Sequence, residues 1–514
     1  MQATTLAQAR QNFPISVRIE ASLFRAALFS ACPMVLSSTD LLAATYYVSL
    51  SGFDSNLGTR AVTWLTRGGG AVRVLLLILV TLAGAAPSWA TTYYVRTDGN
   101  DSNAGSTNSA SGAWRTMQNA ANTAVAGDLV LVQDGTYASG QVQFANSGTA
   151  SQPIIFRAQN IRQAIISSTA SSACQPAFSI HKNHIYIEGF RFQNSGVKCS
   201  LGFTSANAAI RAWDGFVGFQ ARNNQVDFSP HWDVCFKSNQ DGTIMEDNLV
   251  HCDLQSQGPH PTNLGNIFRR NEIWDGSTAG TYLFFKGGAA NVQAYNNILH
   301  LTNAWAIVRG DTDLGNGIGL GGATGGFVGP ECFNCIAYNN VVIKETAGTG
   351  GECFNTRGAK DSAFVNNVGI NCGTMITLGN SGDNTITTNI TIKNNIFYCG
   401  SGQSAYSPGG ATGATLNYNN FFNCSGTPAQ ANAITGDPKF VNLASDWHLQ
   451  VGSPAIGTGT VLSPFPQAGG GKVDISFDRA GVVRTAPWSL GIYAGNSSSG
   501  DVTPPQSPVG LIIH

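Results

Sequence analysis

The chain has 514 residues, of which 43% are hydrophobic, only 11% are charged and 60 are glycine. This composition argues against a helical bundle, which would need Lys, Glu and Leu at helical spacing, and it is typical of a β-rich extracellular protein. The formal net charge of -1 gives no overall attraction to nucleic acid or to an anionic membrane, so a site for a polyanion has to be a local patch.

Residues 1–90 carry what we interpret as two export signals in tandem. Each has a basic flank, a short apolar core and an exit of small residues, the first ending at Ala44 and the second at Ala90. A TYYV strand follows both exits, so we expect a duplication remnant with maturation near Ala90. The expected product is secreted, extracellular, on the cell surface or periplasmic, and has no membrane-spanning domain. A retained N-terminal anchor is the alternative, although the cores are short for a membrane span.

Ten of the eleven cysteines lie beyond residue 91. An even number downstream of an export signal favours disulfides formed in an oxidising compartment, and free thiols packed in a β core are the alternative. Cys332 and Cys335 have the spacing of a zinc or redox pair. No second pair lies nearby, which favours a structural bridge.

Residues 91–170 are expected to form an N-terminal cap and the first coils of the domain. A YYV strand and a polar DGNDSN turn come first, and residues 114–126 then show a short amphipathic helical pattern. LVLVQDGTY and IIFRAQ follow as strands.

Residues 171–430 repeat a short mark, an Asn followed by an apolar residue. The marks are Asn224, Asn248, Asn271, Asn297, Asn340, Asn367, Asn395 and Asn420. Their spacing lies in the twenties, and the interval of 43 residues is interpreted as two turns with one mark missing. Such a period, with short β runs and no helices between them, predicts a parallel β-solenoid. The Asn can adopt a left-handed turn, and stacked copies can hydrogen-bond along the axis as a structural ladder.

Two further segments complete the chain. Residues 431–495 have motifs typical of the C-terminal tail of secreted β-helix proteins, from which we expect a cap. Residues 496–514 are rich in Ser and Pro, and we expect a disordered linker.

Aligning the coils on the repeated Asn and counting back eleven residues predicts a column of side chains outside the solenoid. The column consists of Trp213, Lys237, His260, Lys286 and, in the coil without a mark, Arg309. Strands about 4.8 Å apart would make it roughly 20 Å long. Further along, Arg357 stands ten residues before its Asn. Alternation along each strand predicts that Asp233, Tyr282 and Trp305, four residues before the basic positions, share this face.

A basic row beside aromatic side chains suits an acidic polysaccharide, because Lys and Arg pair with uronate carboxylates and aromatic faces stack on sugar rings. Lys286, flanked by His260 and Arg309, would have its pKa lowered by like charge. A neutral amine could then remove the C5 proton of a uronate while Arg309 neutralises the carboxylate, which is β-elimination. A solvated polar face is the alternative for this row. A non-catalytic glycan-binding or adhesive β-helix is the alternative function, and the SPHWD stretch keeps an epimerase open.

The motifs YYV-x-x-DGNDSN-x-G, W-R-T-M-Q-x-A and AGDLVLVQDGTY resemble the N-terminal cap of secreted bacterial right-handed β-helix proteins. That group includes polysaccharide lyases of the pectate lyase and chondroitinase B types. The resemblance implies an all-β, single-stranded right-handed parallel β-helix (a pectin lyase-like solenoid) of about 10–12 coils, with a short helix in its N-terminal cap.

A Lys followed one coil later by an Arg in R-G-D is similar to the chondroitinase B and alginate lyase family. That resemblance implies that Lys286 is the catalytic base and Arg309 its partner. The family has acidic calcium ligands five and seven residues before the Lys, where this chain has Thr281 and Ala279. We therefore predict no metal ligands there, and Ca²⁺ held elsewhere, for example by Asp233, stays open. We expect a monomer whose partner is an acidic polysaccharide.

Overall fold

The computed structural model describes residues 90–168, 175–194, 208–227, 234–258, 264–274, 281–302, 316–322, 329–345, 350–381 and 385–495. All of them belong to one unit of the chain, Trp89–His514. The predicted export signals, apart from Ala90, and the predicted linker lie outside the described residues. Among the described residues, no helix is long and apolar enough to cross a membrane.

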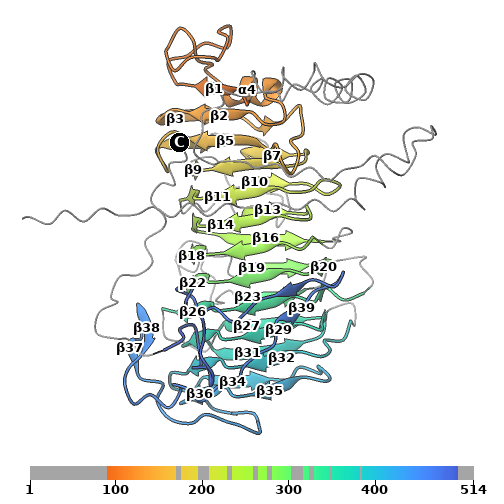
Figure 1. The fold of residues 1–514 in the computed structure, drawn as a ribbon, viewed down its shortest axis with the longest axis vertical. Coiled ribbons are helices and arrows are strands. Elements are labelled where there is room, and N and C mark those ends of the chain that lie inside the picture. The colour runs from red at the N-terminus through yellow and green to blue at the C-terminus, as the bar shows by residue number, and fades with distance from the viewer. Residues whose placement is uncertain are drawn as a thin grey trace, which may run out of the picture. The chain divides into compact units, whose positions relative to one another are not determined.

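Three long parallel sheets, which we call sheets A, B and C, make up the solenoid, and Figure 1 shows their strands stacked coil upon coil. Each complete coil contributes one strand to each sheet in the order A, B, C before the chain returns to sheet A; β1 and the last pair, β35 and β36, belong to incomplete coils. Sheet A has 12 strands: β1 (Thr92–Val95), β2 (Leu129–Val132), β5 (Ile154–Ala158), β8 (Ile185–Glu188), β11 (Gln220–Arg222), β14 (Ile244–Glu246), β17 (Ile267–Arg269), β21 (Gln293–Tyr295), β25 (Ile336–Tyr338), β29 (Ala363–Val365), β32 (Thr391–Lys393) and β35 (Thr415–Asn417).

Sheets B and C are built in the same way. Sheet B has 11 strands: β3 (Gly135–Ser139), β6 (Ala164–Ser168), β9 (Phe190–Asn194), β12 (Gln225–Val226), β15 (Leu249–Val250), β18 (Glu272–Trp274), β22 (Ile298–Leu301), β26 (Val341–Lys344), β30 (Val368–Ile370), β33 (Ile396–Tyr398) and β36 (Asn420–Phe422). Sheet C has 10 strands: β4 (Val142–Gln143), β7 (Phe178–Ile180), β10 (Ala208–Ala212), β13 (Val234–Ser238), β16 (Asp253–Gln257), β19 (Thr281–Lys286), β23 (Asn316–Gly321), β27 (Glu352–Arg357), β31 (Thr374–Gly379) and β34 (Ser404–Ser407). The predicted all-β parallel solenoid is thereby confirmed.

The core lies between the three sheets, where each apolar side chain stacks on its equivalent in the next coil. In sheet C, one fully buried stack consists of Phe236, Leu254, Leu283, Ile318 and Phe354. Alternate residues of a strand face inward, so a strand of three residues needs only one or two apolar side chains. This is why the sequence shows short apolar runs at a regular period.

A ladder of buried Asn side chains lines the corner between sheets A and B. In each rung, the backbone N–H and the side-chain amide donate to Oδ1 of the Asn in the next coil. The rungs are Asn224, Asn248, Asn271, Asn297, Asn340, Asn367, Asn395 and Asn419. Gln430 ends the ladder, because its Oε1 accepts from both the backbone N–H and the amide of Asn419, each at 3.1 Å.

The last rung differs from the prediction, which placed Asn420 in the ladder. Ile396 pairs in register with Asn420, so Asn419 is the equivalent of Asn395, and the Asn420 amide donates instead to the carbonyl of Gly436 at 3.0 Å. The pair of adjacent Asn residues allowed both alignments. The register of the strand, which places Phe421 opposite Phe397, decides between them.

Two other expectations about the repeat are corrected. Asn297 hydrogen-bonds directly to Asn340, so the interval of 43 residues is one long coil and not two turns. The left-handed conformation belongs to the residue before each rung, for example Asn223 with φ 55°, Asn296 with φ 58° and Tyr418 with φ 55°. The left-handed turn and the ladder hydrogen bonds, which were predicted for one Asn, therefore belong to two consecutive residues.

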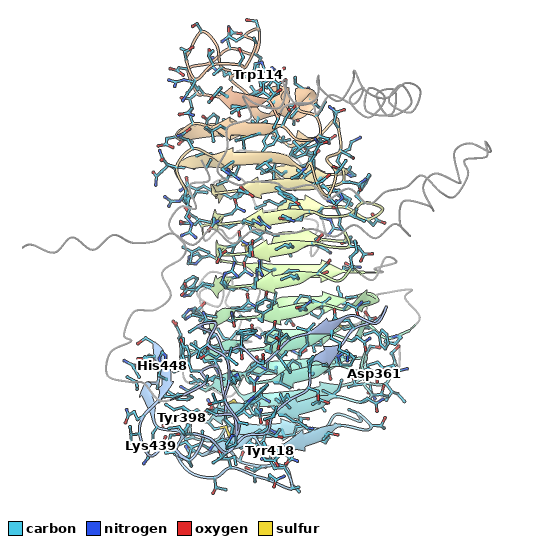
Figure 2. The ribbon with its side chains drawn as sticks, viewed as in Figure 1. Trp114, Asp361, Tyr398, Tyr418, Lys439 and His448 are labelled. Carbon is cyan, nitrogen blue, oxygen red and sulfur yellow. A yellow bond between two sulfur atoms is a disulfide. The ribbon has the colours of Figure 1, made fainter. Side chains whose placement is uncertain are left out.

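The helix α4 (Met117–Thr123) covers the first coils. Thr116 caps it by accepting from the backbone N–H of Asn119 at 3.2 Å, and its buried face consists of Met117, Ala120 and Ala121. Trp114, which Figure 2 labels near this end, stacks on Tyr93 of β1 with ring centroids 4.6 Å apart.

The segment after β36 contains two antiparallel hairpins, β37 (Phe440–Asn442) with β38 (Asp446–Leu449) and β39 (Phe465–Pro466) with β40 (Lys472–Val473). It packs along the outside of the solenoid. Trp447, Leu449 and Leu490 contact outward residues of β26, β30 and β33 in sheet B, and Trp488 and Val473 contact β25 and β29 in sheet A. The two apolar clusters that hold this segment contain no residue of sheet C.

Four disulfides are present among the described residues: Cys235–Cys252, Cys332–Cys335, Cys353–Cys372 and Cys399–Cys424. The C-x-x-C pair is therefore a bridge. Cys332 lies in β24 (Cys332–Phe333), which forms a small sheet with β20 (Ala289–Ala290) and β28 (Ala359–Lys360), and Cys335 directly precedes β25.

Candidate functional site

Two rows of side chains run across the outer face of sheet C. Register pairing defines a first row of Ser179, Arg211, Lys237, Gln255, Phe284, Gly319, Asn355 and Thr377. A second row lies two residues further along each strand and includes Trp213, Gln257, Lys286, Gly321 and Arg357. Both rows alternate with the buried core residues, so both face outward. A ligand lying across the strands would meet cations and aromatic rings together.

The predicted column is wrong in its composition. Lys237 pairs with Arg211 on one side and with Gln255 on the other, not with Trp213 and His260. The physical reason is that the segment joining sheet C to the Asn ladder changes its length. It spans eleven residues after Lys237 but sixteen after Gln255, so a fixed count does not follow the strands.

The same error affects the residue expected beside Lys286. The strand that follows β19 in sheet C is β23, where Phe285 pairs with Leu320. Gly321 is therefore the neighbour of Lys286 in the second row, and Arg309 is not. The prediction counted an additional coil inside the long interval, and that coil does not exist.

The remaining predicted site residues fall into three groups. Asp233, His260, Trp305 and Arg309 lie outside the described residues. Trp213, Lys237, Lys286 and Arg357 lie on the outer face of sheet C, as the rows above describe. Tyr282, which alternation placed on the outer face, is fully buried, and its hydroxyl bonds the backbone of Thr302.

Tyr282 turns inward because alternation is not kept at the start of these strands, where the chain rounds the corner from sheet B. The corresponding part of β13 carries a register shift between Val234 and Phe236, and Cys235 there is also fully buried. Two consecutive residues can thus face the core at this corner.

Lys286 is half-buried at the end of β19. Its Nζ lies 5.1 Å from the ring centroid of Phe284, a cation–π contact. Burial lowers the pKa of Lys286, and the charge of Glu331 opposes this shift. Glu331 is itself fully buried, and its Oε2 accepts from the backbone N–H of Gly287 at 2.6 Å. A group whose ammonium form is disfavoured in this way is a better base than an ordinary lysine.

Lys237 is more strongly perturbed. It is 8% exposed, and burial, with added repulsion from Arg211 and Lys286, lowers its pKa to about 7. Arg211 is 3% exposed, and burial lowers its pKa to about 10. The Arg211 guanidinium lies 4.7 Å from the ring centroid of Trp213, whose Nε1 donates to Oγ of Ser179 at 2.9 Å.

Phe284 lies across the neighbouring glycine-rich strand. A Cβ added to Gly322 would stand 2.2 Å from Cζ of Phe284, and one added to Gly319 would stand 3.0 Å from its Cδ2. The ring can occupy this position only because both residues lack a side chain. The result is a half-buried aromatic surface beside the Lys286 ammonium.

Sequence reasoning missed Arg211 and Phe284. A signal for Arg211 was present, because AIRA of β10 and CFKS of β13 match residue for residue when the strands are aligned by their apolar pattern. Phe284 had no such signal. Its role depends on Gly319 of β23 and on Gly322 directly after that strand, which the predicted alignment placed in a different coil.

For metal binding, the described residues contain no group of three or more His, Cys, Asp or Glu side chains that could hold an ion. Asp233, the residue proposed as an alternative calcium ligand, lies outside the described residues.

Comparison with solved structures shows similar β-helices at low sequence identity. The structure titled pectate lyase Pel9A matches with 17% identity and a TM-score of 0.47, covering 80% of this chain and 98% of that chain. A rhamnogalacturonan lyase matches with 16% identity and a TM-score of 0.44, covering 69% of this chain and 91% of that chain. XylC in complex with xylose matches with 11% identity and a TM-score of 0.49, covering 78% and 98%. No curated protein matches the sequence.

A family model described as "Pel9A-like, right handed beta helix region" matches residues 93–349, which is half of the chain. The match extends from β1 to the strands of sheet C that carry Arg211, Lys237, Phe284 and Lys286. The right-handed, pectin lyase-like β-helix predicted from the cap motifs is thus confirmed, and this chain belongs to the Pel9A-like right-handed β-helix family.

Proposed function

We propose that this protein is exported, binds an acidic polysaccharide across the outer face of sheet C and cleaves it at a uronate by β-elimination. The observation that carries the proposal is the pair of lysines on this face, Lys237 and Lys286, both with a lowered pKa. In the part of the chain that the structure describes, no carboxylate hydrogen-bonds either ammonium. Four disulfides are consistent with export to an oxidising compartment.

Lys286 is the better candidate for the base. It is half-buried beside the ring of Phe284, whereas Lys237 is 8% exposed and lies beside a second cation, Arg211. In the neutral form, its Nζ would accept the proton from C5 of the uronate. The electron pair of that C–H bond would form the C4–C5 double bond as the bond from C4 to the leaving oxygen breaks, and water would protonate that oxygen.

The aromatic side chains on this face would hold the sugar rings. Phe284 presents its ring beside the Lys286 ammonium. Trp213, which directly follows β10 three strands away in sheet C, presents a partly exposed indole. An aromatic face is apolar and flat, so it suits the C–H face of a sugar, while the cations meet its carboxylates. The family is named after Pel9A, and a structure of that name is titled a pectate lyase. Polygalacturonate is therefore the first substrate to test.

The test is to incubate the exported form with polygalacturonate, alginate, chondroitin and heparin, and to follow the ultraviolet absorbance of the unsaturated product. Lys286→Ala is expected to lower kcat by about 10²–10⁴-fold, the usual contribution of a general base. Lys472→Ala, at an exposed lysine of β40, is the matched control and should retain full activity. Retained binding with no product from any of the four polymers would refute the lyase and identify a glycan-binding protein.

A further inference from the structure

Arg211 and Lys237 are neighbouring buried cations, and no anionic side chain among the described residues pairs with either of them. They pair in register on β10 and β13 and are 3% and 8% exposed. Nε and Nη1 of Arg211 are enclosed, and neither atom has a hydrogen-bond acceptor in the described part of the chain. Two positive charges on neighbouring strands repel each other. Buried N–H donors that are removed from water also destabilise the fold unless an acceptor takes their hydrogen bonds. The arrangement is therefore incomplete without an anion.

Among the described residues, the neighbours of Arg211 offer no substitute for that anion. Asp214 attracts the guanidinium through its charge, but no ion pair or hydrogen bond joins the two. Trp213 covers one face of the guanidinium at 4.7 Å, and His181 stacks on the indole with ring centroids 5.2 Å apart. An aromatic wall of this kind orients the cation but supplies no oxygen.

We propose that Arg211 and Lys237 form a subsite for a carboxylate of the bound polysaccharide. This inference rests on the proposed function and adds a second anchoring point to it. Lys286 lies two strands beyond Lys237 in sheet C, a separation of about 10 Å across the strands. The subsite therefore holds a different uronate from the one that Lys286 attacks, and it requires a ligand with acidic groups on more than one sugar.

Both side chains suit a carboxylate. The guanidinium is planar and always charged, so its N–H groups can donate to the two oxygens, and the ammonium of Lys237 supplies a second charge. A bound carboxylate would also favour the protonated form of Lys237, whose pKa is about 7 in the free protein. Binding near neutral pH would thus be accompanied by uptake of a proton.

The test measures binding separately from turnover. In the Lys286→Ala background, calorimetry would give the Kd of trigalacturonate and of trimannuronate, of the methyl ester of each, and of inorganic sulfate. We expect at least one free acid to bind and its ester to bind about 10–100-fold more weakly, the usual effect of losing one charge-assisted contact. Arg211→Met should weaken binding of the acid to a similar extent and leave the ester unchanged. Lys472→Met is the control for charge alone.

Arg211→Lys keeps the positive charge and serves as the control for folding. It should bind the acid with part of the parent's affinity and keep the wild-type melting temperature. Three outcomes would overturn the subsite. The acid and its ester could bind with equal affinity, Arg211→Met could bind the acid as tightly as its parent, or neither acid could bind. Displacement of the oligomer by equimolar sulfate would overturn its assignment to a carboxylate. Acid binding that depends on Arg211 in a protein that forms no product would retain the subsite and refute the lyase. Product formation that does not depend on Arg211 would retain the lyase and refute the subsite.

Discussion

The backbone N–H and the side-chain amide of Asn297 donate to Oδ1 of Asn340 at 3.0 and 2.9 Å, although 43 residues separate the two in sequence. A single coil therefore contains the whole interval. The additional residues stand before and after β23, the strand that lies beside Lys286 in sheet C. The longest coil of the ladder thus supplies the glycines that underlie Phe284.

Replacing one rung of the ladder should destabilise the protein. Asn340→Ala removes the acceptor of two Asn297 donors and the Asn340 amide's own bonds to Ala294 O and Asn367 Oδ1. Leaving buried polar groups unpaired costs about 1–3 kcal/mol each, so we expect a loss of at least 2 kcal/mol in the free energy of unfolding, measured with urea. Asn122→Ala, at an exposed helix position, should change it by less than about 0.5 kcal/mol. Equal effects would contradict a structural role for the ladder.

The lowered pKa of Lys237 should appear in the pH dependence of stability. Its pKa is about 7 in the folded protein and 10.5 for an ordinary lysine, so the unfolded chain binds more protons between these values. Through this group, the free energy of unfolding rises as the pH increases from about 7 to about 10.

Lys237→Met removes the buried charge. The variant should be more stable than the wild type at or below neutral pH, by on the order of 2 kcal/mol, and the difference should shrink towards pH 10. Urea unfolding of both proteins at several pH values measures this difference. A constant difference across the range would show that Lys237 does not titrate as described.

The position of Phe284 can be tested through the glycine beneath it. Gly322→Ala places a methyl group where the ring now lies, so the ring has to move. We expect saccharide binding to weaken about tenfold with little loss of secondary structure, measured by calorimetry and circular dichroism. Gly140→Ala is the matched control, because nothing lies within 4 Å of its added Cβ. Unchanged binding in Gly322→Ala would exclude the Phe284 ring from the saccharide site.

The disulfides should differ in their effect according to the loops that they close. Cys235 and Cys252 are 17 residues apart and join β13, which carries Lys237, to the residue before β16, whereas Cys332 and Cys335 are three apart. Replacing the first pair with Ser should cost about 2–4 kcal/mol, and replacing the second pair should cost less, because a short loop restricts the unfolded chain less. Melting temperatures of the two double variants would test this order, and the reverse order would contradict it.

The fold was predictable because its signal repeats. A buried Asn in each coil can be recognised without knowing the length of the other segments, since each rung bonds only to the next. The position of side chains on sheet C depends on those lengths. Lys237 and Lys286 were placed on the correct face by alternation, but their neighbours were not identified, because the segment between sheet C and the ladder varies from coil to coil.

Gln430 sets where this repeating structure stops. A parallel coil exposes the same donors and acceptors at its end as at every earlier step, so another copy could continue the stack. The Gln430 side chain occupies the place of the next Asn, and its Nε2 donates back to the carbonyl of Asn419 at 2.8 Å. Its single amide therefore occupies the groups that another copy would need at this corner, and we expect loss of this side chain to favour end-to-end association into fibres.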